Sequence, residues 1–514
     1  MNKSHKYSLI SIQGVLLLGA ILRFALLGSI PRGFSVDEAA KGYNAYSIIK
    51  TGKDMRGNFL PLRFTDFSDK RPYTIILYTY LSIPFVAVLG LNETSVRLLA
   101  AAVGTLTLAI LYLLTKKVFN SKTVGLLAAF LLSISPWHIL MSRVGLEAVI
   151  FPLLFLTTWY LLIISLKKTG YIVLASVTLF LSFYSYQTSY VIMPIFLALF
   201  FIFHRDKLNS YKTKQKLIIL AMLITVIGIL PLITLYITDF TNMTGHFHGE
   251  SISNLVKNKA LFPLLVLTQM VFHYISLQLL LLYHIPTLIG FYFGLLLLIK
   301  KIYKKKLIFG KELFLLLMLV TATIPSAFSA NSSIPNLTRS IGMLGIVEMV
   351  AAYGIYKYKK YHSPAFRKLF ALAIFLNSTA MIYFGYPENL GPYIWLQYGF
   401  KEVAKYVENV GNKYDKIVIT NKANQPFIYF LFYNKFPPEK FHKEKVIREY
   451  TSNFTPYETV KSFNKYIFCD ISTCYNNYDN ALYIARPNEV EATMPIANIK
   501  IKNKEVFSIL TSKK

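Results

Sequence analysis

Long apolar runs separated by short polar segments dominate the chain up to Tyr386. A helix needs roughly 20 apolar residues to cross the hydrocarbon core of a bilayer. Apolar runs approaching this length recur at 7–27, 74–91, 96–118, 124–141, 148–165, 171–186, 190–203, 217–237, 261–282, 286–299, 313–330, 341–356 and 369–386. A single water-soluble core has no room for so much apolar surface, so the pattern predicts a polytopic α-helical membrane protein.

Clusters of Lys and Arg predict how these helices are oriented, because cytoplasmic loops are enriched in both residues. The clusters lie at 116–122, 167–168, 205–216, 300–306 and 357–368. If every run crossed, Lys116 and Lys117 would face outside, so two runs are expected to lie at the outer interface: 74–91, which Pro84 breaks, and 261–282. This leaves about eleven spanning helices in a plasma membrane, with the N-terminus in the cytoplasm. The first run is long and lacks a clear small-residue cleavage site, which favours a retained helix over a signal peptide.

The pattern changes after Tyr386, where the chain becomes polar and irregular. A helix is predicted at 400–410 and a second at 426–432, with strands at 416–420, 466–470 and 481–485. The sequence therefore predicts a transmembrane domain over 1–386, with 28–94 as its first outer loop. A small α/β domain follows over 387–514, and the predicted topology makes it extracytoplasmic.

Composition supports a membrane protein and argues against nucleic acid as a partner. Hydrophobic residues make up 54% of the chain and charged residues 16%, against about a quarter charged in soluble domains. The net charge of +30 is concentrated in the predicted cytoplasmic loops. The sequence has no nucleotide-binding glycine loop, so no nucleotide cofactor is expected.

The first candidate site directly follows the first apolar run, in Pro31-Arg32-Gly33-Phe34-Ser35-Val36-Asp37-Glu38-Ala39-Ala40. Ser35 and Glu38 fit a capping box at the start of a helix predicted over 37–50. Ala39, Tyr43, Tyr46 and Ile49 share one face of it, as in a helix lying in the membrane interface. Asp37 and Glu38 either only cap this helix, or Asp37 deprotonates a hydroxyl at the boundary between water and lipid.

Other polar residues also gather near the predicted outer helix ends. Lys70 and Arg71 suit a phosphate, or else they anchor the following apolar segment. Arg143 and Glu147 are four residues apart and are expected to share a helix face, as a local ion pair or as part of a cavity. Further candidates are Tyr186 and Gln187, which line a sugar pocket or belong to an aromatic belt, and Arg339.

Two weaker patterns concern metal binding and redox state. His246, His248 and Glu250 could hold a divalent metal, but the signal is weak and a polar loop is the favoured interpretation. Cys469 and Cys474 are the two cysteines of the chain. They are expected to form a local disulfide if their domain faces an oxidising compartment, and otherwise to remain free thiols.

Taken in order, these motifs resemble the GT-C glycosyltransferases, and more closely the protein O-mannosyltransferase and aminoarabinose transferase superfamily. The similarity rests on Asp37-Glu38-Ala39, Lys70-Arg71-Pro72, Asn92-Glu93-Thr94-Ser95-Val96-Arg97-Leu98, Ser135-Pro136-Trp137-His138 with Ser142-Arg143, Tyr184-Ser185-Tyr186-Gln187, and Ile324-Pro325-Ser326-Ala327 followed by Arg339. It covers roughly residues 1–386.

The resemblance implies a polyprenyl-phosphate sugar as donor, an active site at the outer face and an inverting single displacement. It places the catalytic acidic residue at Asp37, with Glu38 helping to position substrates. Lys70, Arg143 and Arg339 would neutralise the departing polyprenyl phosphate. The acceptor is expected to be a hydroxyl of a protein, lipid or glycan.

Two other classes of protein remain as alternatives. A transporter or flippase of polyprenyl-linked glycans would place functional charges near the bilayer midplane, on discontinuous paired helices. A non-catalytic membrane scaffold would tolerate the loss of Asp37. The polar residues described above cluster at outer helix ends, which favours the enzyme.

Overall fold

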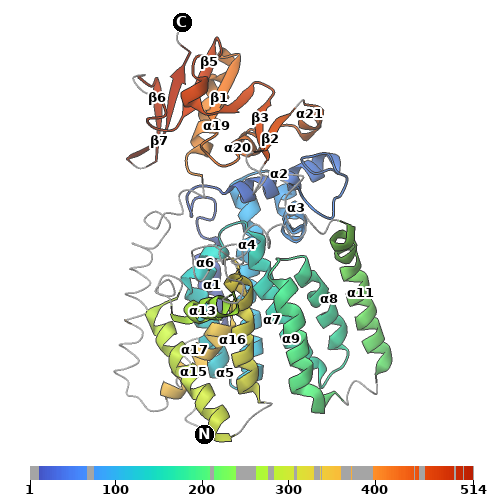
Figure 1. Ribbon diagram of the computed structural model, residues 1–514. Helices are drawn as coiled ribbons and strands as arrows, with labels where there is room; N and C mark the ends of the chain where they lie inside the picture. The colour runs from blue at the N-terminus through green and yellow to red at the C-terminus, as the bar shows by residue number, and fades with distance from the viewer. Residues whose placement is uncertain are drawn as a thin grey trace. The chain divides into compact units, whose positions relative to one another are not determined.

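A computed structural model describes two compact units within the chain (Figure 1). It describes residues 11–65, 67, 75–208, 214–238, 262–275, 283–305, 310–328, 336, 338–359, 372, 397–444, 446–450, 458–490, 494–501 and 503–512. The first unit comprises Met1–Ala25, Ala100–Phe240 and His246–Gly385, and the second comprises Leu26–Leu99, Thr241–Gly245 and Tyr386–Lys514.

The described part of the first unit consists of helices and the turns that join them. In chain order they are α1 (Ile12–Phe24), the larger part of α4 (Glu93–Phe119), α5 (Lys122–Ile134), α6 (Pro136–Met141), η2 (Glu147–Val149), α7 (Ile150–Ser165), α8 (Tyr171–Phe183), α9 (Ser189–His204), η3 (Arg205–Lys207), α11 (Gln215–Thr238), α13 (Phe262–Ile275), α15 (Ile285–Lys305), α16 (Lys311–Ala327), η6 (Ile341–Met343) and α17 (Ile346–Lys359). This confirms the helical fold class that the apolar runs predict.

Five helical stretches among the described residues are long and apolar enough to cross a membrane, judged by length and composition. They are Glu93–Phe119, Glu147–Ser165, Ser189–Lys207, Gln215–Thr238 and Ile285–Lys304. Helix α13 and helix α3 (Leu77–Leu89, with Pro84 inside it) lie in the two runs predicted not to cross. Both are shorter than the roughly 20 residues that a span needs. The total of eleven spans stays a prediction.

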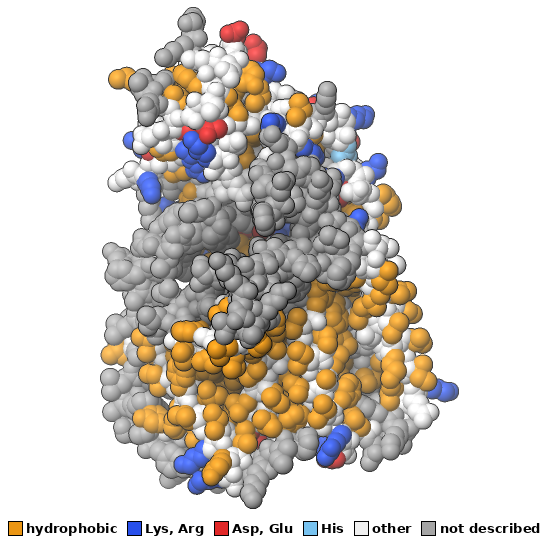
Figure 2. All heavy atoms as spheres, in the orientation of Figure 1, with side chains coloured by type: hydrophobic (Ala, Val, Ile, Leu, Met, Phe, Trp, Pro, Cys, Tyr) orange, Lys and Arg blue, Asp and Glu red, His pale blue; other side chains and the backbone are white. Residues whose placement is uncertain are grey.

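The first unit exposes apolar side chains, as expected of a surface that contacts lipid. On α11, Met222, Val226 and Ile227 are among the exposed large hydrophobic residues. Figure 2 shows a broad hydrophobic band of this kind, with Lys and Arg side chains at its lower edge. Because soluble proteins rarely expose apolar patches of this extent, the band marks a membrane protein.

The second unit contains a mixed sheet of seven strands in the order β2-β3-β4-β1-β5-β7-β6. At its centre, β1 (Lys416–Thr420) runs parallel to β4 (Tyr466–Cys469) and to β5 (Ala481–Ala485). The outer strands pair antiparallel: β2 (Ile447–Tyr450), β3 (Glu458–Phe463), β6 (Ala497–Ile501) and β7 (Lys504–Thr511). Its C-terminal helices are α19 (Phe400–Val410), α20 (Phe427–Tyr433), α21 (Pro438–Lys443) and α22 (Ile471–Cys474). The predicted α/β character of this region is confirmed.

The same unit includes the segment predicted to be the first outer loop, whose helix α2 (Val36–Thr51) shares a hydrophobic core with α19, α20 and the sheet. The rings of Phe34 and Phe432 lie 4.8 Å apart. The Tyr43 hydroxyl donates to the Phe436 carbonyl at 2.8 Å. The helix predicted over 37–50 is confirmed. On the face predicted to lie in the membrane interface, Ile49 is exposed and Tyr46 half-buried, but for Ala39 and Tyr43 the prediction is wrong. Both side chains are fully buried against protein.

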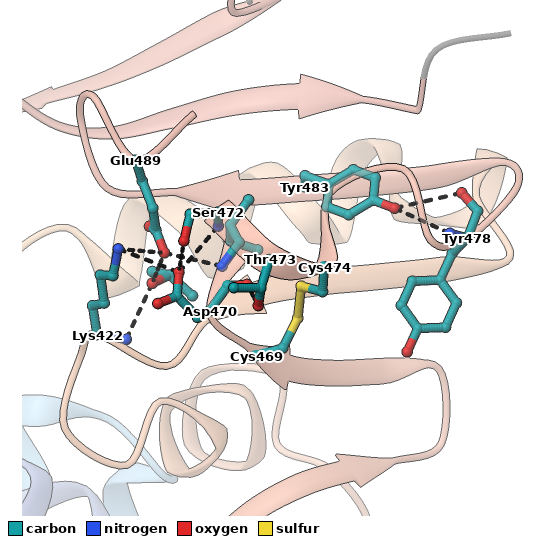
Figure 3. The surroundings of a disulfide bond; sticks show 11 residues. Lys422, Cys469, Asp470, Ser472, Thr473, Cys474, Tyr478, Tyr483 and Glu489 are labelled. Carbon is teal, nitrogen blue, oxygen red and sulfur yellow. Dashed lines mark hydrogen bonds and ion pairs between the residues drawn. A yellow bond between two sulfur atoms is a disulfide. The ribbon is translucent and has the colours of Figure 1, made fainter. Parts of the chain in front are cut away.

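A disulfide joins Cys469, at the end of β4, to Cys474 in α22 (Figure 3). Next to it, the Asp470 carboxylate accepts from the Ser472 backbone N–H at 3.0 Å and so caps α22. Lys422 lies 3.2 Å from the same carboxylate. Of the two states that the sequence left open, the structure holds the oxidised one.

Replacing both cysteines with serine is expected to destabilise this unit by about 2 kcal/mol, since the closed loop is short. The expected result is a lower thermal unfolding midpoint of the full-length protein in detergent. Titration of the native wild type with a maleimide, without reductant, is the control. Labelling of two thiols there would contradict the disulfide.

Candidate functional site

The segment that leads into α2 is held by hydrogen bonds to its backbone carbonyls. The Arg97 guanidinium donates to Pro31 O at 2.9 Å and to Gly33 O at 2.7 Å. The Tyr429 hydroxyl donates to Phe34 O at 2.7 Å. Side chains from α4 and α20 thus fix the backbone immediately before the first turn of α2.

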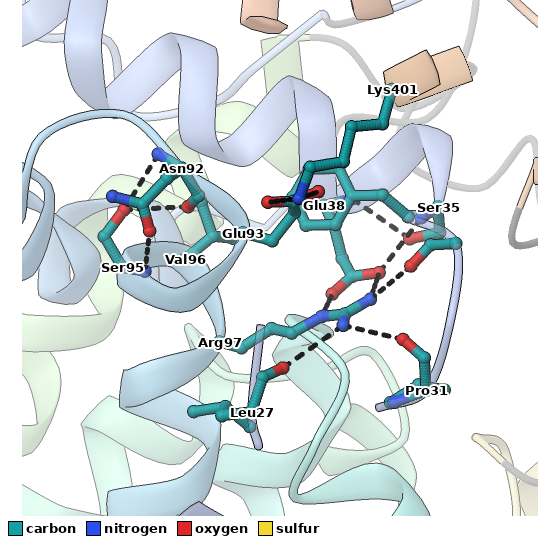
Figure 4. Close-up of polar contacts among 12 residues, drawn as sticks. Leu27, Pro31, Ser35, Glu38, Asn92, Glu93, Ser95, Val96, Arg97 and Lys401 are labelled. Atoms are coloured by element: carbon teal, nitrogen blue, oxygen red, sulfur yellow. Dashed lines mark hydrogen bonds and ion pairs between the residues drawn. The ribbon is translucent and has the colours of Figure 1, made fainter. Parts of the chain in front are cut away.

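Glu38 lies at the centre of this arrangement (Figure 4). Its carboxylate accepts from Arg97 Nε at 2.7 Å and from the Ser35 N–H at 3.0 Å, and the Ser35 hydroxyl accepts from the Glu38 N–H. The predicted capping box is therefore confirmed. Both Glu38 and Arg97 are 0% exposed, so the structure gives Glu38 the role of holding the start of the helix.

Asp37 differs from its neighbour in being exposed to solvent. It occupies the first turn of α2, where the helix dipole favours a carboxylate. Together with Glu38 it raises the pKa of the buried Tyr429 phenol, after the larger effect of burial itself. Asp37 therefore lies near the Tyr429 phenol, and its own side chain is exposed to solvent.

Several residues of this site were missed as candidates in the sequence. The Glu93 carboxylate accepts from Lys401 at 2.9 Å and from the Tyr433 hydroxyl at 3.1 Å. Asn92 caps α4, because its side chain accepts from the Ser95 N–H at 3.0 Å. A charged residue such as Arg97 within an apolar helix is a recognisable signal, but its partner is 59 residues away.

Arg143, in the first unit, binds backbone carbonyls at the end of α1. It donates to Leu22 O at 2.7 Å, to Arg23 O at 3.2 Å and to Ala25 O at 2.7 Å. The last carbonyls of a helix have no partner within the helix, and Arg143 supplies one. The prediction that Arg143 and Glu147 share a helix face is wrong, because α6 ends at Met141 and a turn separates it from η2.

Replacing Arg143 with Met is expected to destabilise the protein by about 2 kcal/mol, because buried carbonyls lose their donors. Arg143→Lys keeps the charge but not the planar fork of donors, so it should recover little of that loss. The measurement is the thermal unfolding midpoint of each variant in one detergent. Full recovery by Lys would show that charge, not the carbonyl contacts, is what matters here.

Two other candidates of the first unit, Arg339 and Tyr186, interact electrostatically. Tyr186 and Gln187 lie half-buried in the turn between α8 and α9. Arg339 is also half-buried, and its backbone N–H donates to the Asn336 side chain at 3.0 Å. Burial lowers the pKa of Arg339, while the nearby Tyr186 phenol acts in the opposite direction. The structure therefore brings together Arg339 and Tyr186, which the sequence separates by 153 positions (339 − 186).

The remaining predicted residues give less information. Glu147 is partly exposed in η2. Lys70, Arg71, His246, His248 and Glu250 lie outside the described residues. Within the part of the chain that is described, no group of three or more His, Cys, Asp or Glu side chains could hold a metal.

Comparisons with known proteins identify the fold. The chain superposes on ArnT from Cupriavidus metallidurans bound to undecaprenyl phosphate with a TM-score of 0.57, at 10% identity over 96% of this chain and 97% of that chain. For the oligosaccharyltransferase AglB from Archaeoglobus fulgidus, in complex with an inhibitory peptide and a dolichol-phosphate, the TM-score is 0.51. The identity is 15%, over 82% of this chain and 63% of that chain.

The fold is thus that of the GT-C glycosyltransferases, and the predicted resemblance to this superfamily is confirmed. More particularly, residues 70–234 match the family described as dolichyl-phosphate-mannose-protein mannosyltransferase. No curated protein matches the sequence significantly.

Proposed function

We propose that this membrane protein is a glycosyltransferase that moves a sugar from a polyprenyl phosphate to a hydroxyl at the extracytoplasmic face. The observation that carries the proposal is the contrast between two adjacent carboxylates. Glu38 is buried, whereas Asp37 is exposed on a helix start that Arg97 and Tyr429 hold in place. A catalytic base needs this combination of a fixed backbone and an accessible side chain.

The reaction is a single displacement at the anomeric carbon. Asp37 takes the proton of the acceptor hydroxyl, and the oxygen attacks the anomeric carbon from the face opposite the phosphate. The bond between that carbon and the phosphate oxygen breaks, and the polyprenyl phosphate leaves with the electron pair. The configuration of the sugar is inverted, and no covalent enzyme intermediate forms.

Cations are proposed to stabilise the leaving phosphate as its negative charge develops. Among the residues that the structure describes, Arg339 is the candidate for this role. Its partial burial places its charge in a less polar environment than water. Lys70 and Arg71 are proposed for the same role from their sequence motif. Arg143 is better explained by its three carbonyl contacts, so we assign it to holding α1.

The donor class is supported by the fold and by the ligands of similar structures. The matched ArnT and AglB structures contain undecaprenyl phosphate and a dolichol-phosphate, respectively. Sugar nucleotides are confined to the cytoplasm, so an outer active site requires a donor carried by the membrane. The acceptor is proposed to be a hydroxyl of a protein, lipid or glycan, and no cofactor is invoked.

The test is sugar transfer in membranes that contain the protein. Radiolabelled polyprenyl-phosphate hexoses and pentoses are supplied separately, with the matching sugar nucleotides as controls, and label in protein, lipid and glycan fractions is counted. Transfer from the lipid-linked donor alone supports the proposal. Movement of intact labelled lipid across the membrane, without transfer, would instead favour a flippase.

A further inference from the structure

A cavity in the first unit lies where the ends of four helical segments meet. It has a volume of about 520 Å³ and is lined by the C-terminal ends of α4 and α7, by the end of α9 with η3, and by the start of α16. This volume falls in the range of ligand sites in proteins. The candidate catalytic residues of the proposed function do not line it.

The charged residues around the cavity all have the same sign. Lys117, Lys167, Lys207 and Lys311 line it together with His204, and none of its lining residues is acidic. Lys117 belongs to α4, Lys167 to the turn after α7, Lys207 to η3 and Lys311 to α16. All four are exposed at the mouth of the cavity, and like charges that converge at a cavity concentrate a positive potential that attracts an anion.

The nearest acidic residues in sequence also lie close to cations that do not line the cavity. Glu312, next to Lys311, is buried and accepts from Lys301. Asp206, next to Lys207, lies 3.8 Å from Arg205. Lys311 donates to Val118 O at 3.0 Å, which ties the start of α16 to the end of α4. Glu312 also acts on Lys311 itself, so these two carboxylates offset only part of the positive charge of the four lysines.

The inner part of the cavity is aromatic. Trp159, Phe203 and Phe314 line it, and the Phe314 ring lies 5.3 Å from Trp159 and 5.5 Å from Phe203 between centroids. His204 stacks on Phe200 at 4.3 Å and donates from Nδ1 to the Phe200 carbonyl. Buried aromatic rings and exposed ammonium groups that line the same cavity match an amphiphile with an anionic head.

We infer that this cavity binds the headgroup of an anionic membrane phospholipid. Basic pockets between membrane helices on the cytoplasmic side are known to recognise such headgroups. The positive clusters of the sequence predict that this end of the helices faces the cytoplasm. The lipid phosphate meets the lysines, and the first methylene groups of its acyl chains meet the aromatic rings.

The experiment measures lipid binding to the full-length protein by native mass spectrometry. Phosphatidylglycerol and phosphatidylcholine with identical acyl chains are titrated into wild type and into K167Q/K207Q. The matched control is K300Q/K304Q, which removes two exposed lysines of α15 that do not line the cavity. The apparent affinity for phosphatidylglycerol is expected to fall by roughly 20-fold in the first variant and by less than about two-fold in the control. Binding of phosphatidylcholine should not change.

Three results would overturn the inference. They are equal binding of the two lipids to wild type, equal losses in both variants, and displacement of phosphatidylglycerol by millimolar inorganic phosphate. The last would indicate a site for a soluble anion. If K167Q/K207Q aggregates, Lys207→Gln alone replaces it, with an expected fall of about five-fold.

Discussion

Replacing Asp37 with Asn is expected to lower the rate of sugar transfer by at least about 100-fold, the lower end of what a general base contributes. Asparagine has nearly the same shape as aspartate but cannot accept the proton of the acceptor hydroxyl. Because Asp37 is exposed, its replacement should leave folding intact. The measurement is initial transfer rate in membranes that contain equal amounts of each protein.

The controls for Asp37 separate catalysis from helix capping. Losing the interaction of the Asp37 charge with the helix dipole should cost less than about 1 kcal/mol, so the thermal unfolding midpoint should fall only slightly. Asp37→Glu keeps the base but displaces it, and it should retain more activity than Asp37→Asn. Equal transfer by wild type and Asp37→Asn would exclude Asp37 as the base. Its role would then be limited to stabilising the first turn of α2.

Replacing Arg97 with Met is expected to destabilise the second unit by about 3–5 kcal/mol, because it leaves a buried carboxylate without its counter-ion. Three carbonyls, those of Leu27, Pro31 and Gly33, lose a donor at the same time. The thermal unfolding midpoint in a fixed detergent should fall clearly. At temperatures where the variant stays folded, kcat should fall more than KM changes. The reason is that the Arg97 hydrogen bonds that fix the backbone before Asp37 are lost.

A double-mutant cycle isolates the Glu38–Arg97 pair from these other contacts. Glu38→Gln removes the charge but preserves the capping box, because glutamine also serves at that position. The double variant E38Q/R97M should therefore be more stable than R97M alone, since no unpaired charge stays buried. Additive losses in the cycle would show that the pair contributes no coupling and that the carbonyl contacts alone explain the effect of Arg97.

Local patterns in the sequence determined much of the secondary structure. The helix predicted at 400–410 and the strands at 416–420 and 481–485 coincide with α19, β1 and β5. These elements are recognisable because a buried helix face recurs every three to four residues, and a central strand is a continuous apolar run. Strands β2, β3, β6 and β7 were missed, because outer strands mix polar and apolar residues.

The candidate site also combines features that the sequence predicted with contacts that it did not. The capping box formed by Ser35 and Glu38 spans four residues, so its spacing alone predicts the start of α2. The sequence also singled out Asp37, because it lies near the predicted outer end of the first apolar run and within a motif that resembles the GT-C glycosyltransferases. It gave no sign that Glu38 would be buried against Arg97 or that Tyr429 would hold Phe34 from 395 residues away.

Only the tertiary structure decided that the first outer loop and the C-terminal region form one unit. Helix α2 packs on α20, and Tyr43 reaches Phe436 across 393 residues of sequence. The sequence by itself determined which stretches become helices and where a helix starts, because those depend on hydrogen bonds and packing between near neighbours. Which carboxylate is buried and which stays accessible depends on partners brought together by folding, and no local spacing contains that information.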